Sequence, residues 1–241
     1  MKFFWHRISI LVLGGCCMAV SSSARADQTL PTSEASLQLT YLSGSDTVWS
    51  DFPKAPALGT PLDEADLLIT LSMQAARTEE QKAEAIRDKK YSIRLVSDVI
   101  DPAFETKYPK TWAMLKMADH EEILINSMLK NSNERCRPFV QHPILVTPLF
   151  AVPDYSYPSG HASGTELQAR ILGYLFPART DELLRRARQV ADSRVVAGVH
   201  YASDTEYGLE LGDLVFRELE ANPRFKSDLE AAAQADKIPR G

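Results

Sequence analysis

Signals that begin and end helices recur along this chain, and they constrain its fold more than any other feature of the sequence. Thr60 and Pro61 suit the N-cap and the first position of a helix, and Pro177 ends the helical stretch that follows Gly160. We find no segment in which apolar and polar residues alternate as they do in a half-buried strand. The chain is therefore predicted to form an all-α, single-domain helical bundle.

Seven helical stretches are expected from apolar spacing and cap residues: from Thr60, from Thr78, over 92–100, over 110–130, from Gly160 to Phe176, from Thr180, and over 203–219. On the first of them, Leu67, Leu68, Leu71 and Ala75 form the apolar stripe that is expected to face the core. The proline-rich segment over 131–157 should be mostly loop, and ordered loops of this length are often functional.

The two ends of the chain differ from this helical middle. Residues 1–26 resemble a signal peptide: Lys2 and Arg7 precede an apolar stretch, and Ala24 and Ala26 have the spacing that a signal peptidase cuts. We expect cleavage after Ala26 and a periplasmic or secreted protein; processing as a lipoprotein at Cys16 is the alternative. An irregular segment over 27–58, the helical domain over 59–222 and a weakly ordered tail over 223–241 would follow.

Charge limits the partners of the mature protein. Cleavage after Ala26 removes three cations and no anion, so the net charge changes from -5 to -8. A chain this acidic has no general attraction to nucleic acid, and no segment after the leader is long and apolar enough to span a membrane. An anionic ligand must therefore be held by a local cluster of cations. Only Cys136 would remain after cleavage, which leaves it no intramolecular disulfide partner, and we expect a small buried residue there.

Three short segments concentrate cations, histidines and small polar residues: Lys130 with Arg137; Ser159, Gly160 and His161; and Arg194, His200 and Asp204. Arginine matches two phosphate oxygens with a planar fork, and lysine adds a compact charge. A glycine at a helix N-terminus lets backbone N–H groups approach an anion. Two histidines can divide the work of a nucleophile and an acid, and an aspartate can orient one of them.

Each of these residues also has a simpler interpretation. Lys130 and Arg137 are ordinary surface charges when they are considered alone, and Asp204 suits the N-cap of the last helix. His161 and His200 lack a third ligand at metal-site spacing, so no metal site is predicted. The ordered set as a whole favours a site for a tetrahedral anion.

In order and spacing, the three segments resemble the signature of the phosphatidic acid phosphatase type 2 superfamily. The string from Tyr155 to His161 is most similar to the bacterial class A non-specific acid phosphatases, although Ala162 stands where threonine is expected. The resemblance implies an α-helical bundle and catalysis without a metal or other cofactor. It also implies that His200 is the nucleophile, Asp204 orients it and His161 is the general acid. The implied phosphate ligands are Lys130, Arg137, Ser159, Gly160 and Arg194.

The sequence therefore predicts an exported acid phosphatase that hydrolyses small phosphate monoesters through a phosphohistidine on His200. Two alternatives stay open: a vanadate-dependent haloperoxidase of the same superfamily, and a phosphoester-binding protein with little turnover. The sequence does not decide the physiological substrate, or whether the protein forms a homo-oligomer.

Overall fold

The computed structural model describes residues 39–43 and 47–238. The helices that begin at Pro61 and Glu79 each start at a capping threonine. The Thr60 side chain accepts a hydrogen bond from the Asp63 backbone N–H, and Thr78 with Gln81 forms a capping box. The helical segments are α1 (Thr47–Ser50), α2 (Pro61–Ala76), α3 (Glu79–Arg87), α4 (Arg94–Ser97), α5 (Phe104–Lys107), α6 (Pro109–Asn133), α7 (Pro138–Gln141), α8 (Gly160–Leu175), the 3-10 turn η1 (Pro177–Arg179), α9 (Thr180–Val196), α10 (Ala202–Ala221) and α11 (Pro223–Ala235).

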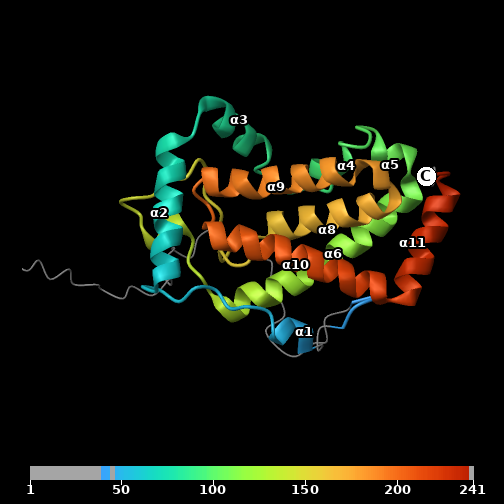
Figure 1. Cartoon of the computed structure of the whole chain (residues 1–241), viewed down its shortest axis with the longest axis horizontal. Coiled ribbons are helices and arrows are strands. Elements are labelled where there is room, and N and C mark those ends of the chain that lie inside the picture. Colours follow the sequence, from blue (N-terminus) through green and yellow to red (C-terminus); the bar gives the residue numbers. More distant parts are fainter. Residues whose placement is uncertain (1–38, 44–46, 239–241) are drawn as a thin grey trace, which may run out of the picture. The chain divides into compact units, whose positions relative to one another are not determined.

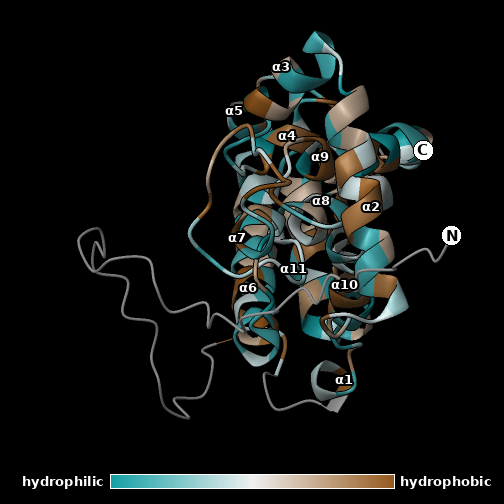
Figure 2. Cartoon of the chain, turned by 90° about the vertical axis from the view of Figure 1, so that its left-hand side faces the viewer, coloured by the Kyte–Doolittle hydropathy of each residue, from teal (hydrophilic) through white to brown (hydrophobic). Residues whose placement is uncertain are grey.

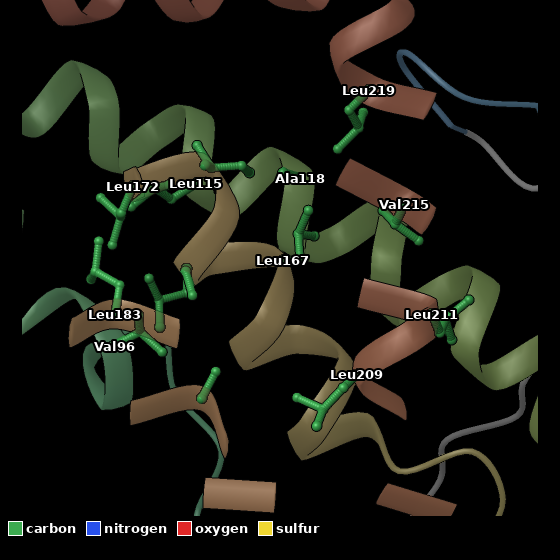
Figure 3. Close-up of a cluster of buried hydrophobic side chains, with 14 of the residues drawn as sticks. Val96, Leu115, Ala118, Leu167, Leu172, Leu183, Leu209, Leu211, Val215 and Leu219 are labelled. Atoms are coloured by element: carbon green, nitrogen blue, oxygen red, sulfur yellow. The ribbon is translucent and has the colours of Figure 1, made fainter. Parts of the chain in front are cut away.

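The bundle is built around α8, which packs against α6, α9 and α10 (Figure 1). Figure 3 shows the apolar side chains between these helices: Leu115 and Ala118 of α6, Leu167 and Leu172 of α8, Leu183 of α9, and Leu211 and Val215 of α10. All of them are fully buried. No strand occurs among the described residues, so the prediction of an all-α bundle is confirmed.

Helices α8 and α10 approach each other closely because α10 presents glycines to its neighbour. A Cβ atom on Gly208 would lie 2.7 Å from the carbonyl oxygen of Ser159, and one on Gly212 would lie 2.7 Å from Cβ of Glu166. Real Cβ atoms essentially never come this near to other heavy atoms. The start of α8 is therefore held directly against the first half of α10.

The buried face of α2 is polar, which corrects the apolar stripe predicted for it. Asp63, Asp66 and Thr70 are the buried residues of this helix, whereas Leu68 is 66% exposed. Figure 2 shows hydrophobic segments along α2 on the side that faces the viewer. The stripe was wrong because an internal arginine, described below, binds the carboxylates of the buried face.

Two further expectations differ from the structure. Over 92–100 only Arg94–Ser97 is α-helical, and bonds between residues three apart, such as Val99 N–H to Val96 O, make turns at its end. The segment after Asn222 is the helix α11, which buries Phe225, Leu229 and Ala233 and packs against α6 and α10. The expectation of a weakly ordered tail was wrong because charged residues stand between the apolar ones in the sequence, so the apolar face of the helix is not obvious from composition.

The expected leader over 1–26 and the possible lipoprotein site at Cys16 lie outside the described residues, as does nearly half of the segment over 27–58 that was expected to be irregular. Within the described part, no helix combines the length and the apolar character that crossing a membrane requires.

Candidate active site

The three motifs meet at one end of the bundle. The start of α8, the end of α9 and the start of α10 lie on the same side, next to α2 (Figure 1). Lys130 belongs to the last turn of α6, and Arg137 precedes the short helix α7. Chain reversals between antiparallel neighbours thus bring together residues up to 74 positions apart in sequence, Lys130 and Asp204 among them.

His200 lies at the centre of this cluster with 2% of its surface exposed. Its Nδ1 atom is 3.4 Å from Asp204 Oδ2, and its Nε2 atom is 3.0 Å from an Arg137 guanidinium nitrogen. A guanidinium has no acceptor, so Nε2 must provide the lone pair and Nδ1 carries the proton toward Asp204. This tautomer presents a nucleophilic nitrogen on the side of the cations.

The surroundings keep His200 neutral. Burial lowers the pKa of this imidazole well below its ordinary value, and the nearby charges of Arg137, Lys130 and Arg194 lower it further. Asp204 is completely buried and accepts hydrogen bonds from the Ser156 hydroxyl and the Tyr201 backbone N–H. The ring is therefore held both in orientation and in the neutral state in which Nε2 keeps its lone pair.

Arg137 and Lys130 are buried beside His200 and share an acidic partner. Arg137 donates to the carboxylate of Asp154 at 2.5 Å, and Lys130 Nζ lies 3.3 Å from the other oxygen of the same carboxylate. Burial lowers the pKa of Lys130 to about 8. These two predicted phosphate ligands thus already bind an anionic group together.

Arg194 is 1% exposed and has few partners for so buried a charge. It donates to the backbone oxygen of Asp88 at 3.4 Å and stacks on Phe150, whose ring centre is 5.1 Å away. Its Nε atom is buried with no hydrogen-bond partner among the described residues. Burial lowers the pKa of Arg194 to about 10, with a contribution from Arg137. A buried donor without an acceptor is suited to receive an external anion.

His161, in the first turn of α8, is half-buried and lies close to Lys89 and Tyr91. Its Nε2 atom is 3.2 Å from the Lys89 backbone oxygen, and its ring meets the Tyr91 ring edge to face. Burial and the charge of Arg194 lower the pKa of His161 to about 3. The influence of Arg194 places this imidazole within electrostatic reach of the cations.

Ser159 and Gly160 form the N-terminus of α8. The Ser159 side chain accepts from the Ala162 backbone N–H at 3.4 Å and so caps the helix, while its own backbone N–H donates to the backbone oxygen of Asp204 at 2.9 Å. A Cβ on Gly160 would make only an ordinary contact with Asn126. These contacts join the second motif to the third, but they do not bring the Ser159 hydroxyl to the cations.

Sequence reasoning missed Arg135, which organises the carboxylates behind His200. Arg135 donates to Asp204 Oδ1 at 2.8 Å, to Asp66 Oδ2 at 2.9 Å and to Asp63 Oδ1 at 3.2 Å. Asp66 in turn accepts from the backbone N–H and the hydroxyl of Ser203. The position of Arg135, two residues before Arg137, was the only available signal for it.

Asp154 and Ser156 were also missed, because one acid or serine in a proline-rich loop carries no periodic signal. The expectation of a buried side chain at Cys136 is not met, because this residue is half-buried.

Residues 121–219 match the family model of the PAP2 superfamily. A non-specific acid phosphatase of Salmonella typhi is 29% identical over 217 residues, which cover 82% of this chain and 84% of the relative.

Two solved structures share the fold. A transmembrane PAP2-type phosphatidylglycerolphosphate phosphatase of Bacillus subtilis aligns with a TM-score of 0.51 and 21% identity, over 76% of this chain and 90% of the other. A bacterial vanadium-dependent iodoperoxidase aligns with a TM-score of 0.58 and 18% identity, over 79% of this chain and 61% of the other. All three sequence motifs lie inside the matched region. The chain therefore matches the PAP2 superfamily model over residues 121–219, and over most of its length it is similar to bacterial non-specific acid phosphatases.

Proposed function

We propose that this chain is an exported acid phosphatase that hydrolyses small phosphate monoesters through a covalent phosphohistidine on His200. The observation that carries the proposal is the placement of the His200 Nε2 lone pair against Arg137, with Nδ1 directed at Asp204. A buried neutral imidazole next to three cations is arranged to attack an anionic phosphorus centre. The similarity to acid phosphatases supports the same reaction.

In the proposed first step, His200 Nε2 attacks phosphorus while the bond from phosphorus to the ester oxygen breaks. The departing oxygen takes a proton from His161. In the second step, His161 takes a proton from water, the resulting oxygen nucleophile attacks phosphorus, and the bond from phosphorus to His200 breaks. Atoms and charge then balance as an alcohol and orthophosphate.

The remaining roles follow from charge and position. Asp204 orients His200 and stabilises the positive charge that develops on its ring. Lys130, Arg137 and Arg194 hold the phosphoryl oxygens, and Ser159 and Gly160 add the N-terminus of α8. These cations supply the positive charge that a metal ion provides in other phosphatases, so no step of the proposed mechanism uses a metal.

A leaving-group series tests the two histidines separately. His200→Ala should abolish turnover of every ester. His161→Ala should abolish turnover of alkyl phosphates, whose leaving oxygen needs a proton, but should still be phosphorylated by dinitrophenyl phosphate. Phosphoenzyme should then accumulate and survive alkaline quench but not acid. Equal losses across the series, or label on a residue other than His200, would contradict these roles.

The fold is shared with an iodoperoxidase as well as with a phosphatase, so the same cations suit tetrahedral vanadate. Orthovanadate should therefore inhibit phosphate release competitively. Peroxide-dependent halide oxidation by the vanadate-treated protein, without ester hydrolysis by the untreated protein, would favour the haloperoxidase alternative.

A further inference from the structure

The hydrogen-bond donors of Arg137 are all engaged by the protein itself. A guanidinium has five N–H groups. Nε donates to the Asp154 backbone oxygen at 2.8 Å, one terminal nitrogen contacts Val199 O at 2.6 Å and His200 Nε2 at 3.0 Å, and the other contacts Asp154 Oδ1 at 2.5 Å and Tyr155 O at 3.2 Å. Arg137 can therefore bind a phosphate oxygen only if one of these acceptors leaves.

Lys130 is in the same situation. Its three N–H groups face the backbone oxygens of Tyr155 and Ser156 and the Oδ2 atom of Asp154, the last at 3.3 Å. The carboxylate of Asp154 thus takes one donor from each of the two cations. It is the one acceptor that they share through a side chain.

The acceptors differ in how easily they can leave. Ser156 is fully buried, and its backbone N–H is bonded to Arg135 O at 2.8 Å, so the carbonyls of this loop are held in place. The Asp154 side chain is 51% exposed and can rotate into water. A carboxylate also resembles a phosphate in charge and in its paired oxygens. Of the groups around the cations, Asp154 is thus the one that an incoming phosphate can replace.

We propose that the carboxylate of Asp154 is a resident anion of the site, which the phosphate group of the substrate displaces from Arg137 and Lys130. The inference rests on the proposed function and adds a residue that sets the affinity for phosphate. Displacement frees two charge-assisted donors, and the nearby negative charge then opposes retention of the product. Asp154 therefore weakens phosphate binding and favours release of orthophosphate.

Removing the carboxylate should tighten binding, whereas a residue that merely supports the loop would weaken it when lost. We expect Asp154→Asn and Asp154→Ala to lower the Kd for orthophosphate by about tenfold, and to lower KM and the inhibition constant for orthophosphate in parallel. Calorimetry on the purified protein measures the Kd without turnover. Thermal melting shows that each variant is folded.

Asp213→Asn is the matched control, because it removes the same charge from a side chain whose ion pairs within the described part of the chain are with Arg170 and Arg217. Its Kd should equal that of the wild type. Unchanged or weaker phosphate binding in both folded Asp154 variants would overturn the inference. Hydrolysis by the wild type together with that result would leave the proposed function intact. Tighter phosphate binding in the variants, without hydrolysis by the wild type, would support the inference about Asp154 and contradict the proposed function.

Discussion

Arg135 shows at the scale of single residues how a buried charge prepares a reactive one. It is 8% exposed and lies between Asp204 and the two aspartates of α2, Asp63 and Asp66. Removing this cation would leave three carboxylates together without their common partner, and like charges repel one another. The orientation of His200 by Asp204 therefore depends on a residue that does not touch the substrate.

Arg135→Ala should lower kcat by roughly tenfold or more and leave KM nearly unchanged. The three carboxylates then repel one another, and Asp204 loses a hydrogen-bond donor, so it should hold the His200 ring less firmly. Steady-state kinetics measure kcat and KM, and Arg135→Lys should restore part of kcat. Arg170→Ala is the control, because Arg170 joins Glu166 to Asp213 away from the site. A lower melting temperature with an unchanged kcat in the folded protein would mean that Arg135 is only structural.

Glu122 is a second buried acid with a consequence for stability. It is 1% exposed, and burial raises its pKa from 4.5 to about 8. In the unfolded chain Glu122 ionises near its ordinary pKa of 4.5, whereas in the folded chain it keeps its proton up to about pH 8. Its contribution to the free energy of unfolding is therefore fully present below about pH 4.5 and is lost as the pH rises through about 8. Ser163 donates its hydroxyl to this carboxyl group, and Asn126 donates to Ser163 at 3.0 Å.

Glu122→Gln keeps the shape of the protonated acid and cannot ionise. We expect it to be more stable than the wild type by about 1 kcal/mol or more at mildly alkaline pH, and nearly equal to it in acid. Thermal unfolding across this pH range measures the difference. Its neighbour Glu121 accepts three backbone N–H groups, so Glu121→Gln should destabilise the protein. An identical pH dependence in wild type and Glu122→Gln would contradict the assignment.

At the scale of elements, the contact between α8 and α10 transmits position to the site. Gly208 brings α10 against Ser159 at the start of α8, and Gly212 brings it against Glu166 further along the same helix. The Ser159 backbone N–H also donates to the backbone oxygen of Asp204. The helix that bears His161 and the helix that bears Asp204 are therefore one packed unit. A change in their spacing should affect catalysis as well as stability.

Gly212→Ala adds a methyl group where Glu166 Cβ is only 2.7 Å from the ideal Cβ position. We expect a loss of about 1–3 kcal/mol in stability, as for other overpacked cores, together with lower kcat in the folded fraction. Urea unfolding and kinetics on the same preparation test both effects. Glu210→Ala, on the exposed side of the same helix, should change neither. Wild-type stability in Gly212→Ala would show that the helices can separate freely.

At the scale of the whole molecule, the chain is acidic, with a net charge of -5, whereas its candidate site is built from cations. Three of them, Lys130, Arg137 and Arg194, are buried next to two imidazoles. Without a bound anion they disfavour the protonation of His161, whose pKa is lowered to about 3 by burial and by Arg194. A phosphate dianion at the same place favours the imidazolium and must raise that pKa.

The pH profile should therefore differ between free and loaded enzyme. The proposed acid is lost when His161 deprotonates, so kcat/KM, which reports the free enzyme, should fall with rising pH from the acidic range onward. The alkaline limb of kcat, which reports the loaded enzyme, should lie at higher pH. Steady-state kinetics with one ester measure both. In His161→Ala with an activated ester this separation should vanish; coincident limbs in the wild type would argue against His161 as the acid.

Helix boundaries and a set of candidate site residues could be predicted from the sequence, because both depend on local chemistry. The caps at Thr60 and Thr78 and the break at Pro177 act within one helical turn, so the helices that they delimit could be predicted. The motif residues could be grouped as one candidate set because their types suit an anion and their order and spacing resemble the signature of the phosphatidic acid phosphatase type 2 superfamily. Neither inference required knowledge of which helices touch.

Only the tertiary structure decided the pairings between distant segments. The apolar stripe assigned to α2 was wrong because Arg135, 69 residues after Asp66, draws the polar face of that helix inward. The helix α11 forms because Phe225 and Leu229 meet the rest of the bundle, which composition alone does not reveal. Asp154 acquires its place from Arg137 and Lys130 in the same way. Buried charges are tolerated only beside opposite charges, and which charges become neighbours is a property of the folded chain.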